Sequence, residues 1–468
     1  MGRTTVRRRT VPIAVAALCL VATLARPALA AAGDRLWIKA FAGTRHRGDR
    51  ATAMAISPDG HTVFVTGEQG GLESSTVAYE ARSGARLWDV HHASMVYPIV
   101  ATNGRRVFVT GLDLDGRGFL TFALDADTGA VRWTRRYHGP VGSSGTPSGI
   151  ALSPDGDSVF LTGERNLTDG SVKEGTVAYS ARDGATLWSA KAAGSPGHDF
   201  SARIAASGAR VFVTTTRDEG ASRQNDFVTI AYDEATGVHL WTRLFDDAGN
   251  WDSATGGVAL GPHGASVFVS GESYDGSDSD YVTVGYDAAD GSRLWKSRYA
   301  GPALYDTPKA ITTSPDRSEL FVTGSSSSIG GIGWPDVATV ALDTVTGTQL
   351  WVSRYGGSAE QLDSPLAIVA SDSDVFVTGT SASSRQYPCE DGSGGLCYDR
   401  DVLTIAYDAG TGSELWVRRH NGTADSDDWG AAVVVDPAGQ RVFVTGEEVA
   451  ETPLATIPRW ITIAYDAS

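Results

Sequence analysis

The chain has 468 residues, which is long for one globular core, because cores usually divide into separate domains beyond about 250–300 residues. Repeat architectures avoid this limit, since each unit packs only against its neighbours. Glycine is abundant (55 residues), which favours many short strands joined by turns. The formal net charge is −16, which excludes nucleic acid and anionic membranes as partners.

The first thirty residues have the pattern of a secretory signal peptide. A basic start ends in Arg7-Arg8-Arg9, an apolar run covers Val11–Leu24, and Ala28-Leu29-Ala30 offers a small-residue cleavage site. The apolar run is shorter than the roughly 20 residues of a spanning helix, so we expect no membrane span. We predict a signal peptide over 1–30, cleaved near Ala30 by the general or the twin-arginine route, and a secreted domain over 31–468. Cleavage removes five of the 39 basic residues and no acid, which leaves 34 basic against 55 acidic residues.

Three short motifs recur eight times along the rest of the chain. One reads VFVTG with small substitutions and starts at Val63, Val107, Val159, Val211, Val267, Leu320, Val375 and Val442. One reads T-x-A-Y-D and starts at Thr76, Thr121, Thr176, Thr229, Thr283, Thr339, Thr404 and Thr462. The third ends in a tryptophan, at Trp37, Trp88, Trp133, Trp188, Trp241, Trp295, Trp351 and Trp416. Eight copies of each motif predict an eightfold repeat protein.

Each motif has the composition of a β-strand, since valine, phenylalanine, threonine and tyrosine favour a packed sheet. Val63 and Val65 point to one face of the strand and Phe64 to the other, so this strand is expected to be buried on both faces. A fourth strand, such as 53–56 or 431–435, precedes VFVTG and ends at a Pro- and Gly-containing turn. The unit is therefore four strands: an inner strand, VFVTG, TxAYD and the tryptophan strand.

The two ends of the repeat region complete each other. The chain finishes at 464–468, just after a third strand, and begins after the signal with 33–37, a fourth strand without a unit. A closed ring needs such a join, because an open ring would expose edge strands. We predict an all-β fold: an eight-bladed β-propeller of four-stranded antiparallel blades, with the last blade closed by the N-terminal strand.

The hairpin between the third and fourth strands reads A-x-D-x-x-T-G-x-x-x-W and is intact at 123–133, 231–241, 341–351 and 406–416. This motif resembles the tryptophan-docking repeat of the quinoprotein alcohol dehydrogenases and the related PQQ-like repeats. The resemblance implies eight blades with a tryptophan wedged between neighbouring blades. It does not imply catalysis, because the family includes non-catalytic members such as an outer-membrane assembly lipoprotein.

Two cysteines remain after the signal, Cys389 and Cys397, and in an exported protein we expect them to form a disulfide that closes a glycine-rich loop. The dehydrogenases hold PQQ against a disulfide of adjacent cysteines, whereas seven residues separate these two, so PQQ is not expected. The longest spacing between successive tryptophans holds this loop. We therefore predict that 381–400 is the distinctive binding element.

Aspartate recurs just before the inner strand, at Asp49, Asp199, Asp306, Asp363 and Asp428, with Asp252 one residue out of register. These carboxylates are expected near one mouth of the central channel, where they bind a cation such as Ca²⁺ or cap loops by accepting backbone N–H bonds. A second acidic series precedes the third strand on the same face, at Glu73, Asp226, Asp280, Asp336 and Asp401.

No complete catalytic motif is present, and no G-x-S-x-G occurs. We therefore expect a non-catalytic binding scaffold, monomeric, with an extracellular protein or glycan as partner. The alternative is an enzyme with its active site on the acidic channel face: a lyase, a hydrolase or a quinone-dependent dehydrogenase.

Overall fold

The computed structural model describes residues 1–2, 30–43, 48–114, 118–138, 144–166, 172–191, 198–218, 225–247, 251–327, 334–357, 361–388, 396–424, 426–451 and 456–467. The chain divides into two compact units, Met1–Ala30 and Ala31–Ser468. Nearly all of the predicted signal peptide lies outside the described residues. Within the part that is described, no helix has the length and apolar character needed to span a bilayer.

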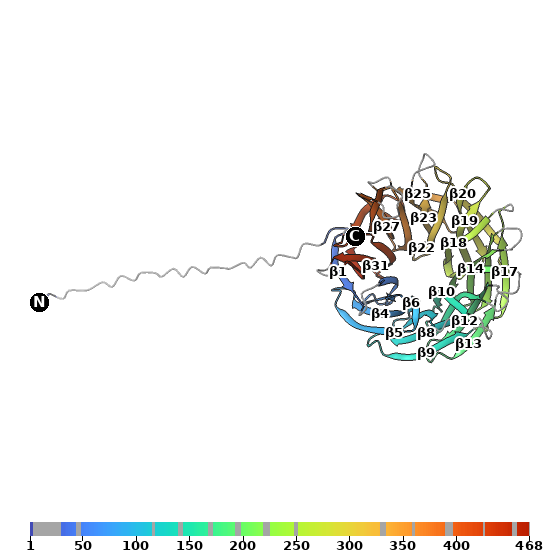
Figure 1. Ribbon diagram of the computed structural model, residues 1–468, viewed down its shortest axis with the longest axis horizontal. Coiled ribbons are helices and arrows are strands. Elements are labelled where there is room, and N and C mark those ends of the chain that lie inside the picture. Colours follow the sequence, from blue (N-terminus) through green and yellow to red (C-terminus); the bar gives the residue numbers. More distant parts are fainter. Residues whose placement is uncertain are drawn as a thin grey trace. The chain divides into compact units, whose positions relative to one another are not determined.

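The second unit is an eight-bladed β-propeller, as the sequence predicts. Its strands form eight four-stranded sheets, and seven of these are built from four consecutive strands in chain order. Figure 1 shows the blades following one another around the ring, from β4 and β5 in blue to β27 and β31 in brown and red.

The strands of blades 1 to 4 are β2 Arg50–Ile56, β3 Thr62–Gln69, β4 Glu73–Glu80, β5 Arg86–Ala93; β6 Met95–Thr102, β7 Arg106–Asp113, β8 Gly118–Asp125, β9 Val131–His138; β10 Ser144–Leu152, β11 Ser158–Asn166, β12 Val172–Ser180, β13 Thr186–Lys191; and β14 His198–Ala206, β15 Arg210–Asp218, β16 Asn225–Asp233, β17 His239–Phe245. Those of blades 5 to 8 are β18 Trp251–Leu260, β19 Ser266–Tyr274, β20 Ser279–Asp287, β21 Arg293–Tyr299; β22 Asp306–Thr313, β23 Glu319–Ser326, β24 Asp336–Asp343, β25 Gln349–Tyr355; β26 Asp363–Ala370, β27 Asp374–Pro388, β28 Leu396–Asp408, β29 Glu414–His420; and β30 Trp429–Val435, β31 Arg441–Glu451, β32 Thr456–Asp466 with β1 Arg35–Phe41. One 3₁₀ turn, η1 Pro262–Gly264, joins β18 to β19.

The VFVTG strands form the packed middle of each blade. Val63, Phe64 and Val65 of β3 are completely buried. The two valines pack in a cluster with Phe443 of blade 8, whereas Phe64 packs with Val107 of blade 2. Because neighbouring sheets cover this strand on both faces, its sequence is continuously apolar.

Each of the eight tryptophans that recur in the repeat donates a hydrogen bond to the next blade. The indole N–H of Trp37 donates to the carbonyl oxygen of Ala81 at 3.0 Å. The ring lies against Gly84, which has a φ of +67° and whose added Cβ would lie 2.7 Å from the ring. The remaining seven indole groups make the equivalent bond, Trp88 to Ala126, Trp133 to Ala181, Trp188 to Glu234, Trp241 to Ala288, Trp295 to Thr344, Trp351 to Ala409 and Trp416 to Ala467. The wedging that the family resemblance implies is therefore present in all eight blades.

The ring closes in blade 8, whose strand order is β1-β32-β31-β30. Strand β1 pairs antiparallel with β32, with Lys39 opposite Thr462. The Arg418 guanidinium of blade 7 donates to the carbonyl oxygen of Gly33 at 2.7 Å. The N-terminal strand thus takes the place of the missing fourth strand and abuts the preceding blade.

We call the face on which the inner strands begin the mouth face. Because the strands of a blade are antiparallel, the loops between second and third strands lie on this face too. Two hairpins there are longer than the rest: β27 and β28 have 15 and 13 residues, and β31 and β32 have 11 each, against 8 each for β3 and β4.

Candidate functional site

The aspartates before the inner strands bind the backbone of their own loops. The structure describes four of the five predicted side chains, and each is at most 1% exposed. Each carboxylate accepts a hydrogen bond from the backbone N–H of a nearby glycine. The pairs are Asp49 with Gly43 (2.7 Å), Asp306 with Gly301 (2.5 Å), Asp363 with Gly357 (2.5 Å) and Asp428 with Gly422. The side chain of Asp199 lies outside the described residues.

Two of these carboxylates use their second oxygen as well. Asp49 also accepts an N–H bond from Gly70 at 3.2 Å, and Asp428 accepts one from Val449 at 2.8 Å. Each of these aspartates therefore ties its loop to the far end of the second strand of its blade. Burial raises the pKa of Asp428 to about 6, against these hydrogen bonds. The arrangement suits loop capping, and cation binding at the five positions stays a prediction.

A group of three carboxylates gathers elsewhere, at the border of blades 4 and 5. Asp226, Asp246 and Asp252 each place a ligand oxygen within 4.8 Å of the others. In the described part of the chain this is the one group with the spacing of a cation site. It joins a member of the second acidic series to the out-of-register Asp252, and oxygen ligands of this kind suit Ca²⁺. Buried Arg217 lies opposite Asp226 in the register of β15 and β16 and supplies positive charge there.

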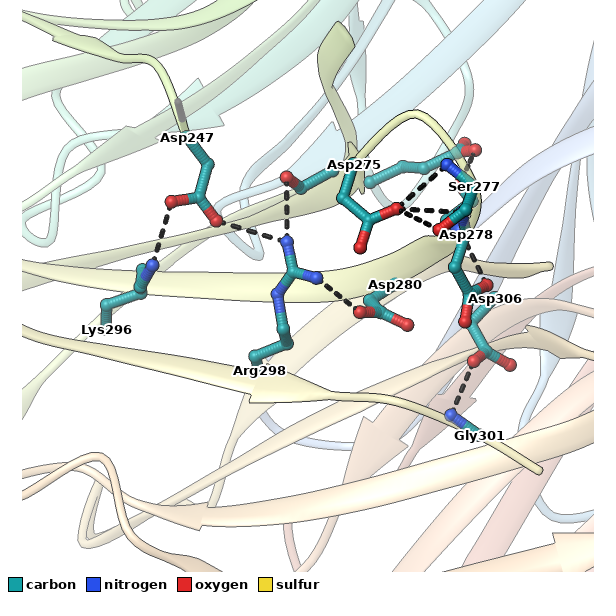
Figure 2. Close-up of polar contacts among 12 residues, drawn as sticks. Asp247, Asp275, Ser277, Asp278, Asp280, Lys296, Arg298, Gly301 and Asp306 are labelled. Atoms are coloured by element: carbon teal, nitrogen blue, oxygen red, sulfur yellow. Dashed lines mark hydrogen bonds and ion pairs between the residues drawn. The ribbon is translucent and has the colours of Figure 1, made fainter. Parts of the chain in front are cut away.

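Three of the five members of the second acidic series are paired with arginines of the outer strands. Arg298 bonds Asp280, Arg354 bonds Asp336 at 3.2 Å, and Arg419 lies 3.3 Å from Asp401. Figure 2 shows Arg298 between Asp280 and Asp247, with Lys296 on the other side of Asp247 at 2.9 Å. These carboxylates are neutralised within their blades, so the series does not make this face uniformly acidic.

Blade 4 departs from this pattern. The residue that corresponds to Arg298 on the outer strand is Leu244, which pairs with Val228 as Arg298 pairs with Val282. Asp226 therefore lacks the outer-strand arginine of blades 5 to 7, and the carboxylates of Asp246 and Asp252 lie beside it instead.

The exposed aromatic side chains lie on the mouth face. Among the described residues five are exposed: Tyr97 (50%), Trp251 (55%), Tyr305 (60%), Trp334 (53%) and Trp429 (41%). Each belongs to the start of an inner or third strand or to the loop just before it. Exposed aromatic rings are enriched in protein interfaces, where they supply large rigid contacts.

Two cavities open among these rings. One of about 430 Å³ lies between blades 4, 5 and 6 and is lined by Asn225, Trp251, Ser253, Glu272, Tyr274, Ser279 and Tyr305. Glu272 is already bonded there, to the hydroxyls of Ser279 and Thr307. The polar groups of this cavity are thus partly used by the protein itself.

The second cavity, of about 470 Å³, lies where blades 7, 8 and 1 meet. It is lined by Arg50, Ala51, Thr52, Ser364, Leu366, Thr380, Trp429, Gly430, Ala431 and Glu447. Trp429 and Glu447 are opposite each other in the register of β30 and β31. Burial raises the pKa of Glu447 to about 7; Arg50 opposes this, and the nearby charges of Asp428, Asp49 and Glu68 add to it.

The central channel has a different lining. A cavity of about 380 Å³ is walled by aliphatic residues of the inner strands together with Arg203 and Lys309. Desolvation lowers the pKa of Arg203. The channel wall thus carries cationic side chains, and the capping aspartates lie at its mouth.

The predicted disulfide falls outside the described residues, since Cys389 and the side chain of Cys397 are not among them. The predicted binding element 381–400 forms the ends of the long β27–β28 hairpin, apart from 389–395. Sequence reasoning missed Trp429 and Glu447. One signal was present: Glu447-Glu448 follows a VFVTG motif at the position where blade 1 has Glu68-Gln69.

Fold and repeat together define a PQQ-like β-propeller. The sequence matches the family described as outer membrane protein assembly factor BamB over residues 72–219 and 224–456, and the chain belongs to this family. No curated protein sequence gives a significant match.

Several solved structures share the fold at low sequence identity. The quinohemoprotein alcohol dehydrogenase from Comamonas testosteroni has a TM-score of 0.57 at 13% identity, covering 93% of this chain and 76% of its own. Sqt1 from Chaetomium thermophilum, bound to the N-terminus of ribosomal protein L10, has a TM-score of 0.57 at 14% identity, covering 93% and 100%. The Dos1 propeller has a TM-score of 0.53 at 10% identity, covering 92% and 94%. Enzymes and non-enzymes thus share this architecture, and the likeness concerns the fold alone.

Proposed function

We propose that the protein is an exported, non-catalytic scaffold that binds an extracellular protein through its mouth face. The observation that carries the proposal is the location of the five exposed aromatic side chains, all on that face. Each costs free energy in water unless a partner covers it, and aromatic residues dominate the binding energy of interfaces.

Two further features support the mouth face as the binding face. It carries both aromatic-lined cavities, and it carries the two long hairpins, β27–β28 and β31–β32. Loops and hairpin ends on a rigid scaffold are the usual place for recognition. On the opposite face and outer edge, the exposed large apolar side chains among the described residues are aliphatic, such as Val345 and Leu350.

Export is part of the proposal and rests on the pattern of residues 1–30. Mass spectrometry of the protein recovered from the culture medium of its source is expected to find an N-terminus near Ala31. Recovery only from the cell interior, with residues 1–30 retained, would contradict it.

The binding face is tested by affinity capture from that medium with three immobilised proteins: wild type, a Trp251→Ser/Tyr305→Ser variant, and a Val345→Ser/Leu350→Ser control. All four side chains are exposed, so the substitutions are expected to leave folding intact. We expect a partner protein that wild type and control retain equally and the aromatic variant retains at least about tenfold less well.

Two outcomes would count against the proposal. Capture that is lost equally in the control would place the interface elsewhere. Binding to a glycan array, with no protein retained, would favour a lectin-like role on the same face.

A further inference from the structure

We propose that the cavity where blades 7, 8 and 1 meet, here called the Glu447 cavity, binds a lysine or arginine side chain of the protein partner. This inference rests on the proposed function and names the chemistry of the partner. The cavity combines a carboxylate, an aromatic ring and a short apolar wall, and these are the three groups that recognise a cation on an aliphatic stem.

The Glu447 carboxylate has no ion pair or hydrogen bond with any residue that the structure describes. It is half-buried in the wall of the cavity. A carboxylate in this position has lost part of its hydration without gaining a cation, which is unfavourable until a charged partner arrives. A cationic side chain would supply the missing partner.

Arg50, the one cationic residue in the lining, is already engaged elsewhere. Its Nε lies 2.9 Å from Oε2 of Glu68, and its guanidinium lies over the ring of Tyr97 at 5.9 Å. Glu68 is itself held by the N–H of Tyr97 at 2.9 Å. Arg50 is thereby drawn toward blade 2, so it lowers the pKa of Glu447 at a distance without pairing with it.

The acids around the cavity outnumber the two cations there, Arg50 in its lining and Arg400 over the ring of Trp429. Asp49, Asp428 and Glu68 all contribute negative charge near Glu447. Each is buried, and their positions are fixed by the backbone and arginine bonds described above. The result is a local excess of negative charge inside an acidic protein, which would attract a basic segment and orient it during encounter.

Trp429 supplies the aromatic wall and is positioned by its neighbours. The Arg400 guanidinium lies 4.6 Å from the ring centroid. At the next residue, Gly430, an added Cβ would lie 2.6 Å from the carbonyl oxygen of Gly379, so only glycine lets β30 press this closely against blade 7. Leu366, which is exposed, and Ala431 complete an apolar wall for an aliphatic stem.

The test measures binding of three probes by ligand-observed NMR at about pH 8, where Glu447 is ionised. The probes are acetyl-Ala-Lys-Ala-amide, the same peptide with uncharged norleucine, and butylamine. We expect the lysine peptide to bind wild type about tenfold more tightly than the norleucine peptide, the factor that a charge-assisted contact contributes.

The variants are Glu447→Gln and a matched control, Glu319→Gln. Glu319 is another partly buried glutamate with a pKa raised by burial, and it lies at the start of β23 on the opposite face. We expect Glu447→Gln to abolish the preference for lysine and Glu319→Gln to leave it unchanged. Equal binding of the two peptides, or an unchanged preference in Glu447→Gln, would overturn the inference.

Butylamine carries the ammonium group without a peptide backbone. If it binds as tightly as the lysine peptide, the cavity is a site for free amines and the docking of a protein side chain is wrong. If the peptides behave as expected but no protein depends on the mouth-face aromatics, the proposed function fails and the cavity chemistry stands. If such a partner is captured equally by wild type and Glu447→Gln, this inference fails and the scaffold role stands.

Discussion

Neighbouring glutamates on β31 are expected to influence stability in opposite directions. Burial raises the pKa of Glu447 to about 7 from its ordinary value of 4.5. Burial alone would also raise the pKa of Glu448, but hydrogen bonds from His420 and Arg459 outweigh it and lower that pKa. Substituting each with glutamine separates the two effects on one strand.

The magnitude for Glu447 follows from its pKa. Between about pH 4.5 and 7 the folded protein holds the proton more tightly than the unfolded chain, so the stability present below pH 4.5 is lost as the pH rises through 7. At about 1.4 kcal/mol per pKa unit the loss is at most about 3 kcal/mol. Glutamine resembles the protonated acid, so Glu447→Gln is expected to equal wild type near pH 4 and to exceed its free energy of unfolding by up to about 3 kcal/mol near pH 8.

Glu448→Gln provides the contrast. The carboxylate is 3% exposed and lies 2.6 Å from Nε2 of His420 and 2.5 Å from Nε of Arg459. Its lowered pKa contributes stability above the ordinary pKa, and this stability is lost as the pH falls through the folded-state value. Near pH 8 the variant is expected to lose about 3 kcal/mol, because the Arg459 guanidinium loses its buried ion-pair partner and the His420 ring loses a hydrogen-bond partner.

Urea unfolding followed by tryptophan fluorescence, repeated from about pH 4 to pH 8, measures both effects. The reasoning is refuted if the difference between Glu447→Gln and wild type does not grow with pH, or if the two variants shift stability in the same direction.

Two other predictions concern the ring and its loops. Trp37→Ala is expected to lower the free energy of unfolding by about 3–5 kcal/mol, as much as Trp241→Ala in an internal blade, because β1 serves as a full outer strand. Urea unfolding measures both variants. A loss below about 1 kcal/mol for Trp37→Ala alone would show that closure of the ring contributes little to stability. Asp363→Ala is expected to lower the free energy of unfolding by about 1–3 kcal/mol, because the Gly357 N–H loses its hydrogen-bond acceptor. Calorimetry is expected to give the same loss with and without added CaCl₂. A loss seen only in calcium would favour cation binding at the predicted aspartates.

The fold was predictable because its determinants repeat. Each of the three motifs, VFVTG, TxAYD and the tryptophan motif, predicts one strand of the blade. The half-units at the two ends of the repeat region predicted the pairing of β1 with β32. Trp37 illustrates this well, because its role follows from seven other tryptophans in the same place. Repetition supplies many copies of one structural fact, which single-sequence reasoning can use.

The candidate site was less predictable because its residues are not part of the repeated motifs. Glu447, Trp429 and Arg50 come from two blades far apart in sequence and meet only because the ring closes. The aspartate series was visible in the sequence, but whether Asp363 bonds Gly357 or a cation depends on where the loop backbone runs. The same limit holds for Asp226, whose carboxylate neighbours Asp246 and Asp252 reach it from the loop after β17 and from β18 of the next blade.

The binding role of the mouth face is tested most directly by photo-crosslinking in the source culture. A photoreactive phenylalanine derivative would replace exposed Trp334 on the mouth face, outside the Glu447 cavity, or exposed Val345 on the opposite face. The account predicts a discrete crosslinked protein from position 334 and none from position 345. Crosslinking from position 345 alone, or equally from both positions, would contradict it.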